Sequence, residues 1–193
     1  MSSSLFASRR RAGIATAAIG FMLIGLPSAV RAQAGTAADS TRPAAKPADV
    51  ASMDAILFAL YDVISGPAGQ RDWQRFRSLF APGARLIPAS PDSAGHPHFT
   101  AMSPDQFVEY ADKVFLTRSF YERQIGKTVD TFGAVTQVFS AYASQNTPSE
   151  APFSRGINSI QLYNDGTRWY VVTIYWNSER PDLKIPPRYI TGK

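Results

Sequence analysis

The spacing of apolar residues changes partway along this chain of 193 residues, and this change constrains the fold most. Up to about residue 115, apolar side chains recur every three or four positions, the period of a helix with one buried face. From residue 120 onward, apolar and polar residues alternate, or β-branched and aromatic residues run together, as in strands. The sequence therefore predicts an α+β domain in which three helices are followed by a sheet.

Local signals predict where the helices begin. The first helix starts after the N-cap residue Ser52 and the second after Asp72. The third has Ser103 as its N-cap, Pro104 at its first position and Gln106 placed to complete a capping box. We expect the buried face of the third helix to consist of Phe107, Tyr110, Ala111 and Val114.

Strands follow, separated by turn residues. A short strand is expected over residues 84–87, and four long strands over residues 120–129, 134–143, 155–163 and 169–176. Asn164, Asp165 and Gly166 tolerate positive φ and predict a hairpin turn between the last two strands. The proline-rich tail over residues 180–193 is expected to extend across the surface.

The first 34 residues have the order of parts of a secretory signal peptide. Three arginines, Arg9 to Arg11, precede an apolar stretch, and a small-residue pattern predicts cleavage after Ala32 or Ala34. An uncleaved membrane anchor is the alternative. The arginine cluster is similar to a twin-arginine signal, with the general secretory route as the other option. We expect a location outside the cytoplasm, either periplasmic or extracellular, and a flexible linker over residues 35–51.

Charge and cysteine content exclude several classes of function. Four of the 20 Lys and Arg residues lie in the predicted signal, which has no acid, so 16 remain against 15 Asp and Glu. This balance gives no electrostatic basis for binding nucleic acid, and we expect membrane contact only during export. The chain has no cysteine, which excludes disulfides and thiolate chemistry.

Three segments carry a resemblance to a known family. Residues 57–61 (LFALY), 79–84 (LFAPGA) and 169–176 (WYVVTIYW) are similar to SnoaL-like sequences of the NTF2-like superfamily. The resemblance spans residues 52–179 and implies a cone, with three N-terminal helices packed on a strongly curved, mostly antiparallel sheet. It also implies a pocket at the open end of the cone, where a few polar groups lie among apolar ones.

Ketosteroid isomerase, the best-known enzyme of this fold, provides a test of activity; it is also a standard example of pKa tuning. The resemblance places Tyr61 and Asn158 at the two hydrogen-bond donor positions of that enzyme. Its catalytic base corresponds here to Pro88, which cannot accept a proton. The resemblance therefore argues against isomerase chemistry through that position.

Other titratable groups are candidates for acid or base roles. His96 and His98 precede the third helix, and His98 is a candidate base; we expect no metal site and no cofactor. Glu122 and Arg123 lie on opposite faces of a strand, and the pattern leaves open which one faces the pocket. A buried, unpaired Glu122 would have a raised pKa and be the leading candidate base. The catalytic residues stay unknown, with Tyr61, His98 and Glu122 as candidates.

Strand alternation predicts the ligand-binding residues. If Asn158 faces inward, so do Ile160 and Leu162, and the neighbouring strand contributes Val172, Ile174 and Trp176. Trp176 either stacks on a flat ligand or closes the core. Arg155 either holds an anionic or carbonyl-bearing ligand or forms an ion pair with Glu122 or Asp130. The candidate ligand-binding residues are Tyr61, Tyr110, Arg155, Asn158, Ile160 and Trp176.

The outer face of the sheet is predicted to carry Tyr163, Val171 and Tyr175, which is more apolar than a solvated face. A homodimer interface explains this pattern, and a covering C-terminal tail is the competing explanation. Three functions follow: an accessory domain that binds a small, largely apolar molecule without catalysis; a lyase, isomerase or hydrolase with a non-standard acid/base group; and an interaction module whose cavity is filled.

Overall fold

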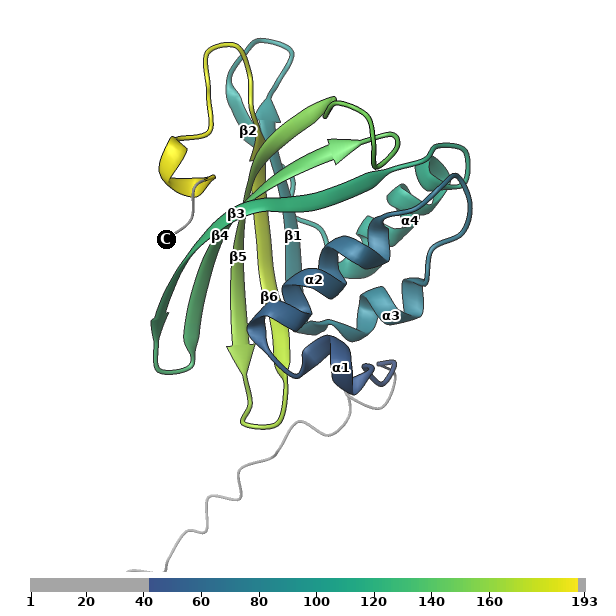
Figure 1. The fold of residues 1–193 in the computed structure, drawn as a ribbon, viewed down its shortest axis with the longest axis vertical. Helices are drawn as coiled ribbons and strands as arrows, with labels where there is room; N and C mark the ends of the chain where they lie inside the picture. The colour runs from purple at the N-terminus through teal and green to yellow at the C-terminus, as the bar shows by residue number, and fades with distance from the viewer. Residues whose placement is uncertain (1–41, 191–193) are drawn as a thin grey trace, which may run out of the picture. The chain divides into compact units, whose positions relative to one another are not determined.

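Helices pack on one face of a curved six-stranded sheet in the structure, a computed structural model that describes residues 42–190 (Figure 1). The helices are α1 (Pro47–Val50), α2 (Met53–Ile64), α3 (Trp73–Ser78) and α4 (Pro104–Phe115), and a 3-10 turn, η1, covers Pro187–Tyr189. The strands are β1 (Phe80–Pro91), β2 (Pro97–Phe99), β3 (Tyr121–Phe132), β4 (Val135–Gln145), β5 (Ser154–Asn164) and β6 (Trp169–Ser178). The predicted signal peptide lies outside the described residues.

The strands lie in the order β2-β1-β6-β5-β4-β3, and this order places β5 and β6 at the centre. β1 runs parallel to β6, and the other neighbouring strands of the described sheet are antiparallel. α2, α3 and α4 lie on the concave side (Figure 1). The predicted α+β fold, with helices packed on a curved and mostly antiparallel sheet, is confirmed; α1 is a fourth helix that the sequence did not predict.

The predicted helix starts are confirmed by hydrogen bonds. Ser52 Oγ accepts from the amide of Ala55 at 3.1 Å. Ser103 Oγ accepts from the amide of Gln106 at 3.2 Å, and Gln106 Oε1 accepts from the amide of Ser103 at 2.8 Å, which completes the capping box. None of the helices within residues 42–190 has the length and apolar character needed to span a bilayer.

The core lies between α2 and the concave face of the sheet. Ile56 of α2 and Val138, Ile160 and Val171 of the strands are fully buried in it. A register shift after Gln161 pairs Leu162 with Val171, so Val171 faces inward. The prediction that Val172 faces the pocket and Val171 the outside is therefore wrong, because the bulge breaks the period of two.

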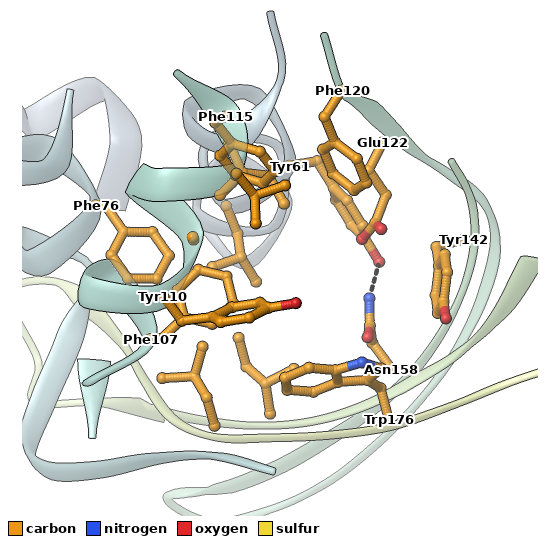
Figure 2. Close-up of a pocket in the computed structure, with 16 residues that line it drawn as sticks. Tyr61, Phe76, Phe107, Tyr110, Phe115, Phe120, Glu122, Tyr142, Asn158 and Trp176 are labelled. Atoms are coloured by element: carbon orange, nitrogen blue, oxygen red, sulfur yellow. Dashed lines mark hydrogen bonds between the residues drawn. The ribbon is translucent and has the colours of Figure 1, made fainter. Parts of the chain in front are cut away.

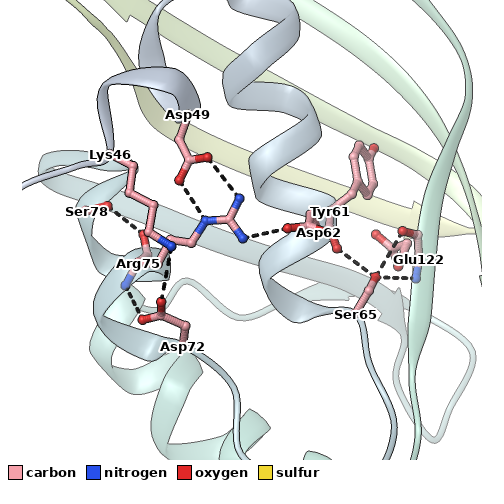
Figure 3. A network of polar contacts seen from close by, with 9 residues as sticks. All are labelled: Lys46, Asp49, Tyr61, Asp62, Ser65, Asp72, Arg75, Ser78 and Glu122. Carbon is pink, nitrogen blue, oxygen red and sulfur yellow. Dashed lines mark hydrogen bonds and ion pairs between the residues drawn. The ribbon is translucent and has the colours of Figure 1, made fainter.

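The predicted linker over residues 35–51 is wrong at its C-terminal end. Residues 47–50 form the helical turn α1, and Val50 is buried. Asp49 accepts hydrogen bonds from Arg75 at 2.7 and 2.9 Å, and Arg75 also binds Asp62 at 2.6 Å (Figure 3). The hydrogen bonds from Arg75 lower the pKa of Asp49 below its ordinary value. An ion pair across 26 residues thus orders a segment that has no periodic pattern of its own.

β1 is longer than the strand predicted over residues 84–87, and it forms a hairpin with β2 that the sequence analysis missed. Ser90 pairs with His98 in this hairpin, which places the histidine on an edge strand rather than in a loop. Pro88 lies within β1 opposite Trp176 of β6. Prolines weaken the strand signal because they cannot donate to a ladder, which explains the missed residues.

The C-terminal tail covers part of the outer sheet face. Tyr189 of η1 stacks on Phe139 of β4, with ring centroids 5.3 Å apart. A Cβ at position 126 would lie 2.3 Å from the carbonyl oxygen of Tyr189, so Gly126 permits this close approach. Ile185 of the tail is buried. The covering tail, proposed as one explanation for the apolar outer face, therefore accounts for the part over β3 and β4.

Candidate functional site

A cavity of about 240 Å³ that opens to solvent lies between the helices and the sheet (Figure 2). Most of its lining residues are aromatic or aliphatic. They come from α2, α3 and α4 and from every strand of the described sheet except β2. Eight aromatic residues line the cavity, namely Tyr61, Phe76, Phe107, Tyr110, Phe115, Phe120, Tyr142 and Trp176. The remaining lining residues are Leu60, Ile64, Leu86, Ala111, Val114, Glu122, Asn158 and Ile174.

The polar groups gather at one end of this cavity. Asn158 Nδ2 of β5 donates to the Tyr61 hydroxyl of α2 at 3.1 Å. The Tyr61 hydroxyl also shares a hydrogen bond of 2.6 Å with Ser140 Oγ of β4, which accepts from Gln124 Nε2 of β3 at 2.6 Å. Figure 2 shows the Glu122 carboxyl beside the hydroxyl of Tyr61. We name Tyr61, Glu122, Ser140 and Asn158 the polar end of the pocket.

Burial changes the acidity of this end. The pKa of Glu122 is raised from 4.5 to about 7, mainly because burial disfavours the charged carboxylate, while hydrogen bonds from Ser144 and Asn158 act in the opposite direction. Ser144 Oγ donates to Glu122 Oε2 at 2.8 Å. The pKa of Tyr61 is raised by burial and next by the charge of Glu122. Glu122 therefore changes charge near neutral pH, whereas Tyr61 keeps its proton.

Strand pairing and one serine position Glu122. Glu122 lies opposite Ser144 in the β3–β4 ladder. Its backbone amide donates to Ser65 Oγ at 2.9 Å, and this hydroxyl donates to the Tyr61 carbonyl at 2.7 Å (Figure 3). The end of α2 is thus fixed to β3 beside the carboxyl. The question left open by the sequence is answered: Glu122 faces the pocket, while Arg123 is exposed and donates to Gln145 at 3.2 Å.

A second hollow of about 470 Å³ lies between α2 and β3, and Tyr61 and Glu122 line both hollows. The second hollow also contacts Phe58, Arg123 and Lys127. The pair Tyr61 and Glu122 therefore forms a partition between an apolar cavity and a more polar groove. Glu122 is therefore only half-buried as a whole residue, because it borders both hollows. Its carboxyl group is nevertheless desolvated enough to raise its pKa.

Trp176 and Tyr110 also line the cavity, and Trp176 lies directly opposite Asn158 in the β5–β6 ladder. Trp176 of β6 is half-buried and lines the cavity opposite the helices (Figure 2). Tyr110 lines the same cavity but is 69% exposed, which places it at the mouth. The prediction that Tyr110 belongs to the buried face of its helix is wrong, whereas Ala111 is buried as predicted, together with Val108 and Phe115.

Three predicted site residues do not reach the cavity. The side chain of Arg155 points to the outer face, where its Nε lies 3.4 Å from Glu179 Oε2; its ion-pair partner is neither Glu122 nor Asp130. Ile160 is fully buried in the core and does not line the cavity. His98 is exposed on β2, and its Nε2 lies 3.5 Å from Thr100 Oγ1. The structure therefore places neither Arg155, predicted to bind the ligand, nor His98, a candidate base, at the cavity.

Three residues of β4 were missed by the sequence analysis. Ser140, Tyr142 and Ser144 are buried and face the concave side at alternate positions, and each makes a hydrogen bond at or near the cavity. The signal was present as hydroxyl-bearing residues with a period of two in an apolar strand. Among residues 42–190, no three His, Asp or Glu side chains lie close enough together to hold a metal ion.

Comparisons with known proteins find similarity in shape. No family model matches the chain, and no curated protein matches it. An NTF2-like protein of unknown function from Shewanella baltica is 14% identical, with a TM-score of 0.43, over 67% of this chain and 98% of that one. A putative ketosteroid isomerase from Parabacteroides distasonis is 13% identical, with a TM-score of 0.47, over 66% and 88% of the two chains.

A third solved structure, a protein of unknown function with a cystatin-like fold from Nostoc punctiforme, is 11% identical. Its TM-score is 0.48, and the similarity covers 65% of this chain and 90% of that one. These values assign no activity and no residue role. The structure itself has the arrangement that the resemblance implied, with helices packed on the concave face of a curved, mostly antiparallel sheet.

Proposed function

We propose that this domain binds a small, largely apolar molecule that carries one polar group. The mostly apolar cavity with its polar groups at one end is the observation that supports the proposal most. Its volume of about 240 Å³ is below the range of about 300–1,000 Å³ usual for drug-sized ligands, which favours a compact ligand. The aromatic body would bury the apolar part, and Tyr61, Glu122 and Asn158 would orient the polar group.

The polar end favours a ligand with a carbonyl or hydroxyl group. Below its pKa of about 7 the Glu122 carboxyl is an additional hydrogen-bond donor, and above it the carboxylate accepts only. A carbonyl ligand should therefore bind more tightly at pH 6 than at pH 8. An isolated anionic ligand is disfavoured above pH 7, because it would face the carboxylate in a desolvated site.

Calorimetric titration with 2-tetralone and with tetralin, which lacks the carbonyl, tests this proposal. We expect both to bind and 2-tetralone to bind more tightly, with the difference reduced in Asn158→Leu. Val114→Trp, which fills the mouth of the cavity, serves as the matched control and should bind neither. Equal binding to the wild type and Val114→Trp, or no binding of either compound to the wild type, would contradict the proposal.

A second candidate function is proton transfer by Glu122. The observation that favours it is a carboxyl with a pKa of about 7 beside the Tyr61 hydroxyl and the Asn158 amide. In this reaction the carboxylate takes a proton from the carbon next to a ligand carbonyl, and hydrogen bonds to the carbonyl oxygen stabilise the enolate. Glu122 would supply the base from β3 that Pro88 cannot supply from β1.

Deuterium exchange into 2-tetralone in D₂O separates catalysis from binding alone. Catalysis predicts that the wild-type protein accelerates exchange more strongly as the pH rises through about 7. Glu122→Gln should bind the ketone and lose the acceleration. If the wild-type protein binds the ketone but does not accelerate deuterium exchange, the domain binds its ligand without catalysis, as expected from the sequence. The third hypothesis, a filled cavity, is disfavoured by the cavity volume.

The cellular location of the protein is proposed from the sequence alone. Arg9 to Arg11, the apolar stretch after them and the pattern ending at Ala34 support export by a cleaved signal. We expect the mature N-terminus at Gln33 or Gly35, as read by mass spectrometry of protein purified from the cell envelope. An intact Met1 in protein from the cytoplasm would contradict export.

Self-association through the outer sheet face is also proposed. Tyr163 and Tyr175, 42% and 46% exposed, lie on the part of this face over β5 and β6. The turn η1 covers the part over β3 and β4, so the proposed homodimer would use the part that carries Tyr163 and Tyr175. Native mass spectrometry should show twice the mature mass, with Tyr175→Glu as a monomeric variant. A monomer at all concentrations would contradict it.

A further inference from the structure

A separate polar hollow of about 230 Å³ lies beside the start of β1. It is bounded by the segment before α1, by α3, by β1 and by the first residues of α4, and it shares no lining residue with the cavity beside Glu122. The pairing of β1 with β6 shifts register between Phe80 and Arg85. The intervening residues leave the regular ladder, and three of them, Ala81, Gly83 and Ala84, line the hollow.

Three arginines from separate parts of the chain line this hollow, with a single acidic residue. Arg42 precedes α1, Arg77 is in α3, and Arg85 is in β1, while Asp105 belongs to the first turn of α4. The side chains therefore carry a net charge of plus two. Arg77 Nε pairs with Asp105 Oδ1 at 2.6 Å, but the Asp105 side chain is 71% exposed, so water screens much of its charge.

The other two arginines have no carboxylate partner within residues 42–190. Arg85 uses one nitrogen, Nη1, which donates to the carbonyl oxygens of Gly83 at 2.8 Å and Ala84 at 2.9 Å. Its Nε and Nη2 stay available. Arg42 makes no side-chain hydrogen bond or ion pair in the described part of the chain. Two arginines with unused hydrogen-bond donors therefore line one hollow.

We propose that this hollow binds the phosphate group of a phosphorylated small molecule or lipid headgroup. A phosphate monoester carries about two negative charges at neutral pH, which matches the net charge of the lining. Guanidinium groups match the geometry of phosphate oxygens and bind them through paired hydrogen bonds. The Ser103 hydroxyl lies at the same hollow and is a further potential donor. This site is independent of the proposed apolar ligand.

Calorimetric titration of the full-length protein with inorganic phosphate at pH 8 and low ionic strength tests the site. We expect saturable binding of one phosphate, weakened about 10- to 100-fold in Arg85→Gln and in Arg42→Gln, since each substitution removes a charge-assisted hydrogen bond. Arg118→Gln is the matched control: Arg118 is exposed just after α4 and lines neither hollow. It makes the same charge change and should leave the affinity unaltered.

The substituted arginines are not in ion pairs, so the variants should unfold at the same temperature as the wild type. An unchanged unfolding temperature shows that weaker phosphate binding is not caused by misfolding. Sedimentation with vesicles of phosphatidylcholine containing phosphatidic acid identifies the source of the phosphate. Vesicle binding that inorganic phosphate competes away indicates a lipid headgroup, and phosphate binding without vesicle binding indicates a soluble ligand. Unsaturable binding, equal weakening by Arg118→Gln, or unchanged affinity in the Arg42→Gln, Arg85→Gln double variant would each overturn the proposal.

Discussion

The two ends of the cavity differ in how they are built. The apolar body is lined by side chains from several helices and strands, each in contact with others: the Phe76 ring lies 4.8 Å from that of Phe80 and 5.3 Å from that of Phe107. The polar end depends on a short chain of hydrogen bonds through Tyr61, Ser140 and Asn158. The body therefore contributes stability at any pH, whereas the polar end responds to pH and to the loss of a single atom.

This difference teaches where stability and function are located. Apolar contacts are many and not directional, so a loss costs free energy in proportion to the volume removed. A buried polar network has few members, and removal of one leaves the others without partners. Substitutions at the two ends should consequently differ in their pH dependence as well as in their magnitude.

The largest effect is expected at the apolar body. Phe76→Ala removes a ring that is 1% exposed and should lower the free energy of unfolding by about 3–5 kcal/mol. Urea denaturation should give the same loss at pH 5 and pH 8, because no titrating group is touched. Phe58→Ala, which removes a ring that is 69% exposed, is the control, with an expected change below about 0.5 kcal/mol. A strongly pH-dependent loss for Phe76→Ala would break the comparison.

The next effect concerns Glu122. Its folded-state pKa of about 7 lies above the unfolded value of 4.5, so the folded state retains a proton that the unfolded state has released. Stability from this group is therefore present in full below about pH 4.5 and is lost as the pH rises to about 7, by on the order of 3 kcal/mol.

Glu122→Gln should remove this slope, as measured by urea denaturation across pH 4.5 to 8. Glu109→Gln, on the exposed face of α4, is the matched control and should keep the wild-type slope. A wild-type slope that persists in Glu122→Gln would assign the pH dependence to another group.

A smaller loss is expected at Ser140. Ser140→Ala removes the partner of both the Tyr61 hydroxyl and the Gln124 amide and should lower the free energy of unfolding by about 1–3 kcal/mol. Ser159→Ala on the outer face removes one partly exposed hydrogen bond, from Gln137, and serves as control. Equal losses of unfolding free energy in the two variants, measured by thermal or urea unfolding, would mean that the hydrogen bonds of Ser140 stabilise the protein no more than that of Ser159 on the outer face.

The smallest effect on stability is expected at Tyr110. Because this side chain is 69% exposed, Tyr110→Ala should change the free energy of unfolding by less than about 0.5 kcal/mol. Its position at the mouth predicts a faster release of 2-tetralone, measured by stopped-flow displacement. Unchanged release rates together with a large loss of stability would place Tyr110 in the core instead.

The elements with strong local signals were predictable from the sequence. The capping box at Ser103 and Gln106 and the turn at Asn164 to Gly166 depend on neighbouring residues, and both are found. α1 was missed because it spans four residues and is held by Arg75, 26 residues away. The full length of β1 was missed because Pro88 and Pro91 weaken the strand pattern.

The candidate site was predictable in part. Alternation on β5 correctly placed Asn158 toward the concave side, and the resemblance correctly paired it with Tyr61. The inward direction of Glu122 was not readable, because a register shift between Gln124 and Gly126 breaks the period of β3. Arg155 was misplaced since its partner, Glu179, comes from a tail that the alternation of strands does not describe.

The central claim is that the polar end of the cavity holds a carboxyl that changes charge near neutral pH. Carbon-13 NMR titration of glutamate side chains in the full-length protein, with Glu122 assigned by comparison with Glu122→Gln, tests it most directly. The structure predicts a midpoint of about 7 for Glu122. A midpoint near 4.5, the value of an exposed glutamate, would contradict the buried and desolvated site on which the proposed function rests.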